Sequence, residues 1–348
     1  MHAGQSLTRG YMKNLRRTKK RIIYAYAAGL AMLFCAVLLG ISLGGTDIKL
    51  AEIFSILFSG ETDSADARIL YYVRLPRTLA GIICGAALAV SGAVIQGTLA
   101  NKLASPSIIG VSSGAGLAVT LCSAFGILGG WRLSLFSFLG AFLTVMLVSL
   151  GAKRRGASRG TLILMGVAIN SLLGAVSDAV ITFTPEIAVM STDFKVGDLS
   201  SVTYSRLVPA AVVVSVALIL LFTLSNELDV LTLGDENARG LGLNTRIMRP
   251  LLLMLAAALA ASAVSIAGLL SFVGLLVPHA VRRLSGGAAK HLLPLSAIFG
   301  AGFLTLCDTL ARVVFAPYEI PVGIIMAFLG APFFLFILLK KKGDEDND

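Results

Sequence analysis

Long apolar runs separated by short polar segments occupy most of this 348-residue chain. A helix that crosses a membrane needs about 20 mostly apolar residues. The runs that reach this length lie at 22–43, 77–97, 106–126, 133–151, 161–183, 207–225, 292–311 and 321–340. They predict an all-α, polytopic membrane protein in which residues 22–341 form a single transmembrane domain.

One further apolar run, at 250–278, decides the predicted topology. As a single span it would place the basic clusters at 246–249 and 282–283 on opposite sides of the membrane. As two short helices that break near Gly268, it would place both clusters on the same side. The run is too short for two full crossings at a rise of 1.5 Å per residue. At least one half must therefore be short or broken, which a membrane tolerates only inside a bundle or beside a cavity. The two-helix interpretation predicts ten transmembrane helices.

The charge distribution supports this topology. The formal net charge is +10, yet only 14% of the residues are charged, against about 25% in soluble proteins. Under the ten-helix topology, 21 of the 29 Lys and Arg residues fall on one side. Basic loops face the cytoplasm, so we expect both termini there and no nucleic-acid partner. Residues 1–21 form a basic cytoplasmic segment before a retained first span, and 342–348 an acidic, disordered tail.

Several kinds of chemistry have no matching motif. The chain contains no phosphate-binding loop of the GxxxxGK[ST] type, so we expect it not to hydrolyse ATP. It also has no HExxH motif, only three histidines, and four cysteines without a CxxC pair. We therefore expect no catalytic residues, no metal site and no cofactor. Within the apolar runs, Asp178 and Asp308 remain as ionisable residues. Asp308 stands four residues before Arg312, so it can either pair with it or line a pathway.

Two arginines at the mouth of the second span, Arg74 and Arg77, run against the charge bias, because the topology turns them outward. Pro76 between them favours a helix that starts at this point. One explanation is local: Asp63 and Asp66 neutralise the arginines, or the side chains reach the lipid headgroups. The other is a protein partner, because a guanidinium group binds a carboxylate through two parallel hydrogen bonds.

Several long motifs, in order, then suggest a family. They include "RLPRTLAGIICGAALAVSGAVIQG", "NKLASPSIIGVSSGAG", "LGDENARGLGLN", "FVGLLVPHAVRRL" and "EIPVGIIMAFLGAPFF". From about residue 69 to 341 the chain resembles the FecCD-type permease subunits of bacterial ABC importers for iron–siderophore, haem and cobalamin uptake. The resemblance implies a type II ABC importer permease fold of ten helices in the bacterial cytoplasmic membrane. It also implies a second permease subunit, two cytoplasmic ATPases and an extracytoplasmic substrate-binding protein. We expect a ferric-siderophore-type chelate as cargo, with haem or cobalamin as alternatives.

The resemblance also implies roles for individual residues. The residues that match the docking site for the binding protein are Arg74, Arg77 and Arg312. The segment that matches the ATPase-coupling helix contains Asp235, Glu236, Ala238, Arg239 and Gly242. The cytoplasmic gate corresponds to Asn101, Leu103 and Ser158, and the translocation pathway to Asn170, Pro321 and Gly323. Lys102 departs from the family pattern, because most relatives have proline after the asparagine.

Two rival functions remain. An ion-coupled secondary transporter would work without ATPase subunits and would depend on Asp178 or Asp308. A membrane-embedded enzyme would need a nucleophile paired with a base, and the chain offers no such pair.

Overall fold

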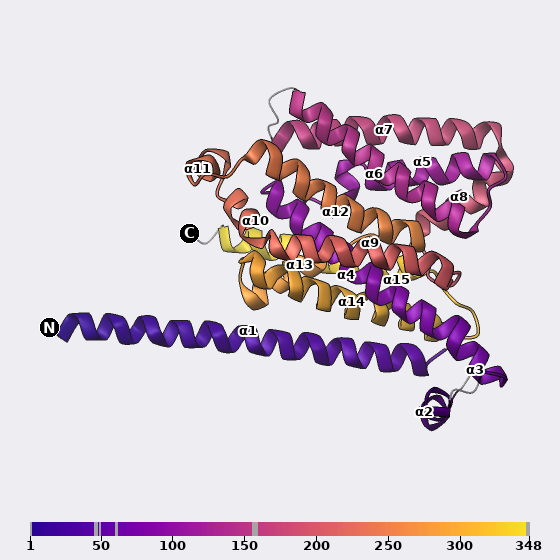
Figure 1. Cartoon of the computed structure of the whole chain (residues 1–348), viewed down its shortest axis with the longest axis horizontal. Coiled ribbons are helices and arrows are strands. Elements are labelled where there is room, and N and C mark those ends of the chain that lie inside the picture. The colour runs from indigo at the N-terminus through magenta and orange to yellow at the C-terminus, as the bar shows by residue number, and fades with distance from the viewer. Residues whose placement is uncertain (1, 45–47, 49, 60–61, 155–158, 346–348) are drawn as a thin grey trace.

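The computed structural model of the chain describes residues 2–44, 48, 50–59, 62–154 and 159–345, and most of them lie in helices (Figure 1). The α-helices are α1 (His2–Ser42), α2 (Leu50–Ser59), α3 (Ala65–Ile69), α4 (Leu75–Thr98), α5 (Val111–Ala124), α6 (Gly130–Arg154), α7 (Arg159–Phe183), α8 (Ala188–Val196), α9 (Tyr204–Thr223), α10 (Ser225–Thr232), α11 (Asp235–Gly240), α12 (Thr245–Ala267), α13 (Val273–Ser285), α14 (Ala289–Val313) and α15 (Val322–Glu345). Short helical turns η1 (Leu70–Arg74), η2 (Pro106–Ile109) and η3 (Pro185–Ile187) join some of them.

The predicted spans correspond to the observed helices. Within the described residues, seven helices are long and apolar enough to cross a membrane, namely α1, α4, α6, α7, α9, α12 and α14. Two shorter apolar helices cover 111–124 and 322–335. With α13, the second half of the broken run, these helices account for the ten that the sequence predicts.

The broken run divides where the sequence predicts it. Helix α12 ends at Ala267, and α13 begins at Val273. Gly268 and Phe272 have φ values of 71° and 67°, in the left-handed region that interrupts a helix. The break is fastened to the end of α8, because the N–H of Leu269 donates to the carbonyl of Phe194 at 2.9 Å. The two halves are unequal, since α12 extends back to Thr245 and only α13 is short.

The terminal segments are more helical than the sequence suggests. Helix α1 runs from His2 through the basic segment 1–21 into the first span. Helix α15 extends to Glu345, so part of the segment predicted to be disordered is helical, and residues 346–348 lie outside the described residues. Extending an existing helix costs far less than starting one.

Helix α4 forms the centre of the bundle and is buried along almost its whole length by α12, α13 and α14. Small residues permit this close packing. A Cβ atom on Gly85 would overlap the backbone of Gly300 in α14, and one on Gly92 would overlap the backbone of Gly274 in α13. The helices therefore meet through their backbones at these two crossings.

The bundle has two ends, named here the Ser42 end and the α11 end (Figure 1). The Ser42 end contains the last turn of α1, the first turn of α4, helix α8 and the last turn of α14. The α11 end contains α10, α11 and the beginnings of α12 and α14.

Candidate functional site: an arginine cluster and a central cavity

At the Ser42 end, the three arginines predicted to bind a partner lie together in one buried cluster. Arg74 is 2% exposed, and Arg77 and Arg312 are each 3% exposed. Arg77 donates from Nε to both carboxylate oxygens of Asp308, at 3.0 and 3.1 Å. It also donates from Nη1 to Glu319 at 2.6 Å. The carboxylates that hold Arg77 therefore come from α14 and the segment after it, rather than from Asp63 and Asp66.

The other two arginines hold the carboxyl end of α1. Arg74 donates to the carbonyls of Ile41 and Ser42, at 2.8 and 2.6 Å. Arg312 donates to the carbonyls of Gly40 and Leu43, at 3.0 and 3.2 Å. The last carbonyls of a helix have no partner within the helix and carry partial negative charge. These hydrogen bonds thus satisfy both the buried guanidinium donors and the helix-end carbonyls.

The predicted pairing of Asp308 with Arg312 is confirmed. The carboxylate of Asp308 lies 3.3 Å from Nε of Arg312, four residues later in α14. Asp308 is 1% exposed and serves two guanidinium groups at once. Glu319, which also contacts the cluster, has a side chain that is 41% exposed.

A cavity of about 390 Å³ lies beside the break between α12 and α13. Four serines and several apolar side chains contribute to its wall, including Leu103 from the predicted gate and Phe272 from the break. The serines are Ser105, Ser107, Ser112 and Ser271. Phe272 packs against Gly330 of α15, where a Cβ atom would lie within 2.4 Å of the phenyl ring. The cavity therefore connects the gate loop, the broken helix and the last helix.

The gate loop follows α4 and has a fixed turn. Asn101 donates its backbone N–H to the carbonyl of Gln96 at 3.0 Å, and its side-chain oxygen accepts from the N–H of Leu103 at 2.9 Å. This pattern ends the helix as a C-cap motif with Ala100 in the left-handed region, at φ 47°. Leu103 is 49% exposed at the mouth of the cavity. The third predicted gate residue, Ser158, lies outside the described residues.

The three predicted pathway residues have different surroundings. Asn170 of α7 donates to the carbonyl of Ser107 at 2.9 Å and accepts from the hydroxyl of Ser113, so it holds α7 against η2 and α5. Pro321 lines a second cavity, of about 590 Å³, at the Ser42 end. Gly323 packs on the end of α8, and its N–H donates to the carbonyl of Gly197 at 3.1 Å.

At the α11 end, the predicted coupling residues form a compact turn between α10 and α12. Ala238 is fully buried, whereas Glu236 and Arg239 are exposed. Asp235 forms an ion pair with Arg249 of α12. Gly242 has φ 84°, which allows the chain to reverse after α11. The turn therefore has a charged outer surface and a fixed connection to α12.

Several contacts that position these sites were not predicted. Asp229 of α10 accepts from the N–H of Ala289 at 2.9 Å, so α10 caps the start of α14. Gln96 of α4 donates to the carbonyl of Gly274 at 3.1 Å and accepts from Arg282. In both cases the partners are far apart in the sequence, so no local spacing could have indicated them.

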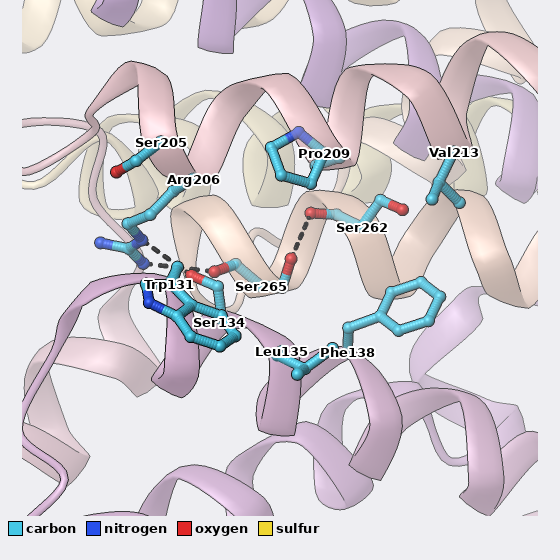
Figure 2. Close-up of a pocket in the computed structure, with 11 residues that line it drawn as sticks. Trp131, Ser134, Leu135, Phe138, Ser205, Arg206, Pro209, Val213, Ser262 and Ser265 are labelled. Atoms are coloured by element: carbon cyan, nitrogen blue, oxygen red, sulfur yellow. Dashed lines mark hydrogen bonds between the residues drawn. The ribbon is translucent and has the colours of Figure 1, made fainter.

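A third cavity, of about 220 Å³, lies between α6, α9 and α12, near the Ser42 end. Figure 2 shows Arg206 at one end of it, with the guanidinium group directed toward Ser134 and Ser265. Arg206 donates to the carbonyls of Ser265 and Ile266, at 3.2 and 3.3 Å. It thus holds the carboxyl end of α12 as Arg74 and Arg312 hold that of α1.

The described residues contain no group of three or more His, Cys, Asp and Glu side chains that could hold a metal ion. What the geometry offers instead is a buried charged cluster at one end, an exposed charged turn at the other, and a serine-lined cavity in between.

Comparison with known proteins identifies the family. Residues 32–340 match the FecCD transport family. The chain is 36% identical over 344 residues to the iron(3+)-hydroxamate import system permease protein FhuB of Bacillus subtilis, covering 95% of this chain and 89% of that protein. It is 37% identical over 296 residues to the hemin transport system permease protein HmuU of Yersinia pestis, covering 83% and 88%.

A solved structure shares the fold. An inward-facing ABC transporter of the metal-chelate type superposes with a TM-score of 0.81 at 29% identity, covering 92% of this chain and 99% of that one. The chain is an integral, multi-pass membrane protein, and it belongs to the FecCD transport family.

Proposed function

We propose that this chain is the permease subunit of an ABC importer that moves a ferric-siderophore-type chelate across the bacterial cytoplasmic membrane. The observation that carries the proposal is the family match over residues 32–340, together with relatives named as import permeases for iron(3+)-hydroxamate and hemin. The permease acts with a second permease subunit, identical or related, and with two cytoplasmic ATPases. Haem and cobalamin remain the alternative cargoes.

In this proposal the Ser42 end faces outward and the α11 end faces the cytoplasm, with both termini inside. The positive-inside rule supports this orientation, because the basic loops gather at the α11 end. A substrate-binding protein docks at the Ser42 end through carboxylates that reach Arg74, Arg77 and Arg312. The ATPases bind at the α11 end, on the exposed charged turn around Glu236 and Arg239.

Transport requires that the two ends influence each other. Closure of the ATPases moves α11, and α11 is fixed to α12 by the ion pair between Asp235 and Arg249. The same movement reaches α14 through the contact of Asp229 with Ala289. Helices α12 and α14 pack against α4, and α12 ends at the break that lines the central cavity together with the gate residue Leu103. Displacement of these helices therefore opens the central cavity to one side at a time.

Uptake in proteoliposomes tests the proposal. Purified permease is reconstituted with and without its ATPases, and entry of ferric hydroxamate, ferric citrate and haem is measured with the binding protein outside and ATP inside. We expect uptake of a ferric chelate only when ATPase and ATP are both present. Uptake that persists without ATP, or that follows a proton gradient, would instead support an ion-coupled secondary transporter.

A further inference from the structure

We propose that Glu319 is the resident carboxylate of the docking site, which holds Arg77 in the undocked permease and is replaced there by an acidic residue of the binding protein. This inference rests on the proposed docking role of Arg77. It makes Glu319 a positioning residue that sets how tightly the partner binds. The predicted docking arginines are buried and already bonded to carbonyls or carboxylates.

Of the two carboxylates on Arg77, only Glu319 can be exchanged. Asp308 is almost fully buried, bonds Nε through both oxygens, and also lies 3.3 Å from Arg312. Removing it would leave two buried guanidinium groups short of a counter-charge. Glu319 makes a single bond to Nη1, and its side chain is 41% exposed. A partner that approaches the Ser42 end therefore meets Glu319 above Arg77.

The guanidinium group of Arg77 has a hydrogen-bond donor that an incoming carboxylate could use. Among the described residues, its Nη2 atom is buried and has no hydrogen-bond partner. A carboxylate that replaced Glu319 could accept from Nη1 and Nη2 together, whereas Glu319 accepts from Nη1 alone. Paired, charge-assisted bonds of this kind are stronger than a single one. The exchange also conserves charge, because one carboxylate takes the place of another.

The position of Glu319 in the chain gives the exchange a structural consequence. Glu319 lies in the segment between α14 and α15, two residues before Pro321, which lines the cavity at the Ser42 end. Gly323, two residues further on, bonds to Gly197 at the end of α8. Release of Glu319 therefore removes one of the contacts that hold the segment before α15, while the N–H of Ile320 still donates to the carbonyl of Ala311 at 3.1 Å. On the same segment, Phe315 and Tyr318 are 54% and 79% exposed and offer contact area to the partner.

Binding measurements on the full transporter test the inference. The wild-type and Glu319→Gln permeases are assembled with their ATPases in nanodiscs, and the dissociation constant of the substrate-binding protein is measured at two salt concentrations. Glutamine keeps the shape but carries no charge, so competition for Arg77 weakens. An exposed ion pair of ordinary strength favours its closed state by a factor of about 1.4 to 5. We therefore expect the binding protein to bind the Glu319→Gln permease about two- to sixfold more tightly.

Two control variants separate the possible outcomes. Asp178→Asn removes a carboxylate at the same end, one that pairs with Lys195 at 3.9 Å, and should leave the affinity unchanged. Arg77→Gln should abolish binding. If Arg77→Gln binds as tightly as wild type, the proposed docking role of Arg77 is wrong. Suppose instead that Arg77→Gln loses binding, that Glu319→Gln binds no more tightly than wild type, and that both variants melt at the wild-type temperature. Docking by Arg77 then stands, and the exchange at Glu319 is refuted.

Discussion

The crossing of α4 and α13 gives the most direct prediction, the effect of Gly92→Ala. A Cβ atom at Gly92 would lie 1.8 Å from the carbonyl oxygen of Gly274 and 2.4 Å from its carbonyl carbon. Neither obstacle can rotate away, because both are backbone atoms. Overpacking of this kind costs about 1–3 kcal/mol. The same carbonyl accepts the hydrogen bond from Gln96, and lengthening that bond adds about 1 kcal/mol.

We therefore expect Gly92→Ala to lower the free energy of unfolding by about 2–4 kcal/mol. The assay is thermal unfolding of the purified permease in detergent, where the midpoint should fall by about 3–6 °C. The matched control is Gly116→Ala in α5, where an added Cβ would have no atom within 4 Å. There, alanine should be neutral or stabilising, because it favours helix by up to about 1 kcal/mol over glycine. Equal midpoints for the two variants would refute the close approach of α4 and α13.

Three further predictions concern the charged sites and the gate. Asp308→Asn should lower the free energy of unfolding by about 3–5 kcal/mol, because two buried guanidinium groups lose a shared carboxylate; an unchanged melting temperature would contradict the buried cluster. Asp235→Asn should reduce chelate uptake more than ATP hydrolysis, since it loosens α11 from α12, whereas Asp178→Asn, which breaks an exposed ion pair with Lys195 at the Ser42 end, should preserve their ratio. Comparable ratios in the two variants would show that the ion pair does not transmit motion. Leu103→Trp should lower uptake severalfold by filling the mouth of the central cavity, while Leu139→Trp on the exposed side of α6 should leave it intact; uptake at the wild-type rate in the first variant would remove Leu103 from the pathway.

Local patterns in the sequence predicted most of the fold. Apolar runs of membrane-spanning length located the helices, and the positions of basic clusters located the break near Gly268. The pairing of Asp308 with Arg312 was predictable because residues four apart share a helix face. These features depend on near neighbours in the chain, so the residues themselves carry the information.

The surroundings of the candidate site depend on distant contacts, and the sequence did not predict them. Arg77 meets Glu319 from a position 242 residues away, and the segment that carries Glu319 has no periodic pattern. Burial of Arg74 and Arg312 follows from where α1 ends relative to α4 and α14. Unpaired carbonyls at a helix end need hydrogen-bond donors, but the tertiary packing decides which side chain supplies them. The carbonyls at the end of α1 thus give these arginines a third explanation, besides local charge pairing and a partner.

Helix α14 joins the two ends of the molecule as one continuous helix. Its 25 residues span about 37 Å at 1.5 Å per residue. Asp229 accepts a hydrogen bond from its first residue, Ala289, and Arg77 forms an ion pair with Asp308 near its end. A tilt of about 5° around one end would shift the other by about 3 Å, roughly the length of a hydrogen bond. A single helix can therefore transmit a movement from one end of the molecule to the other, and its side chains need not line the route taken by the cargo.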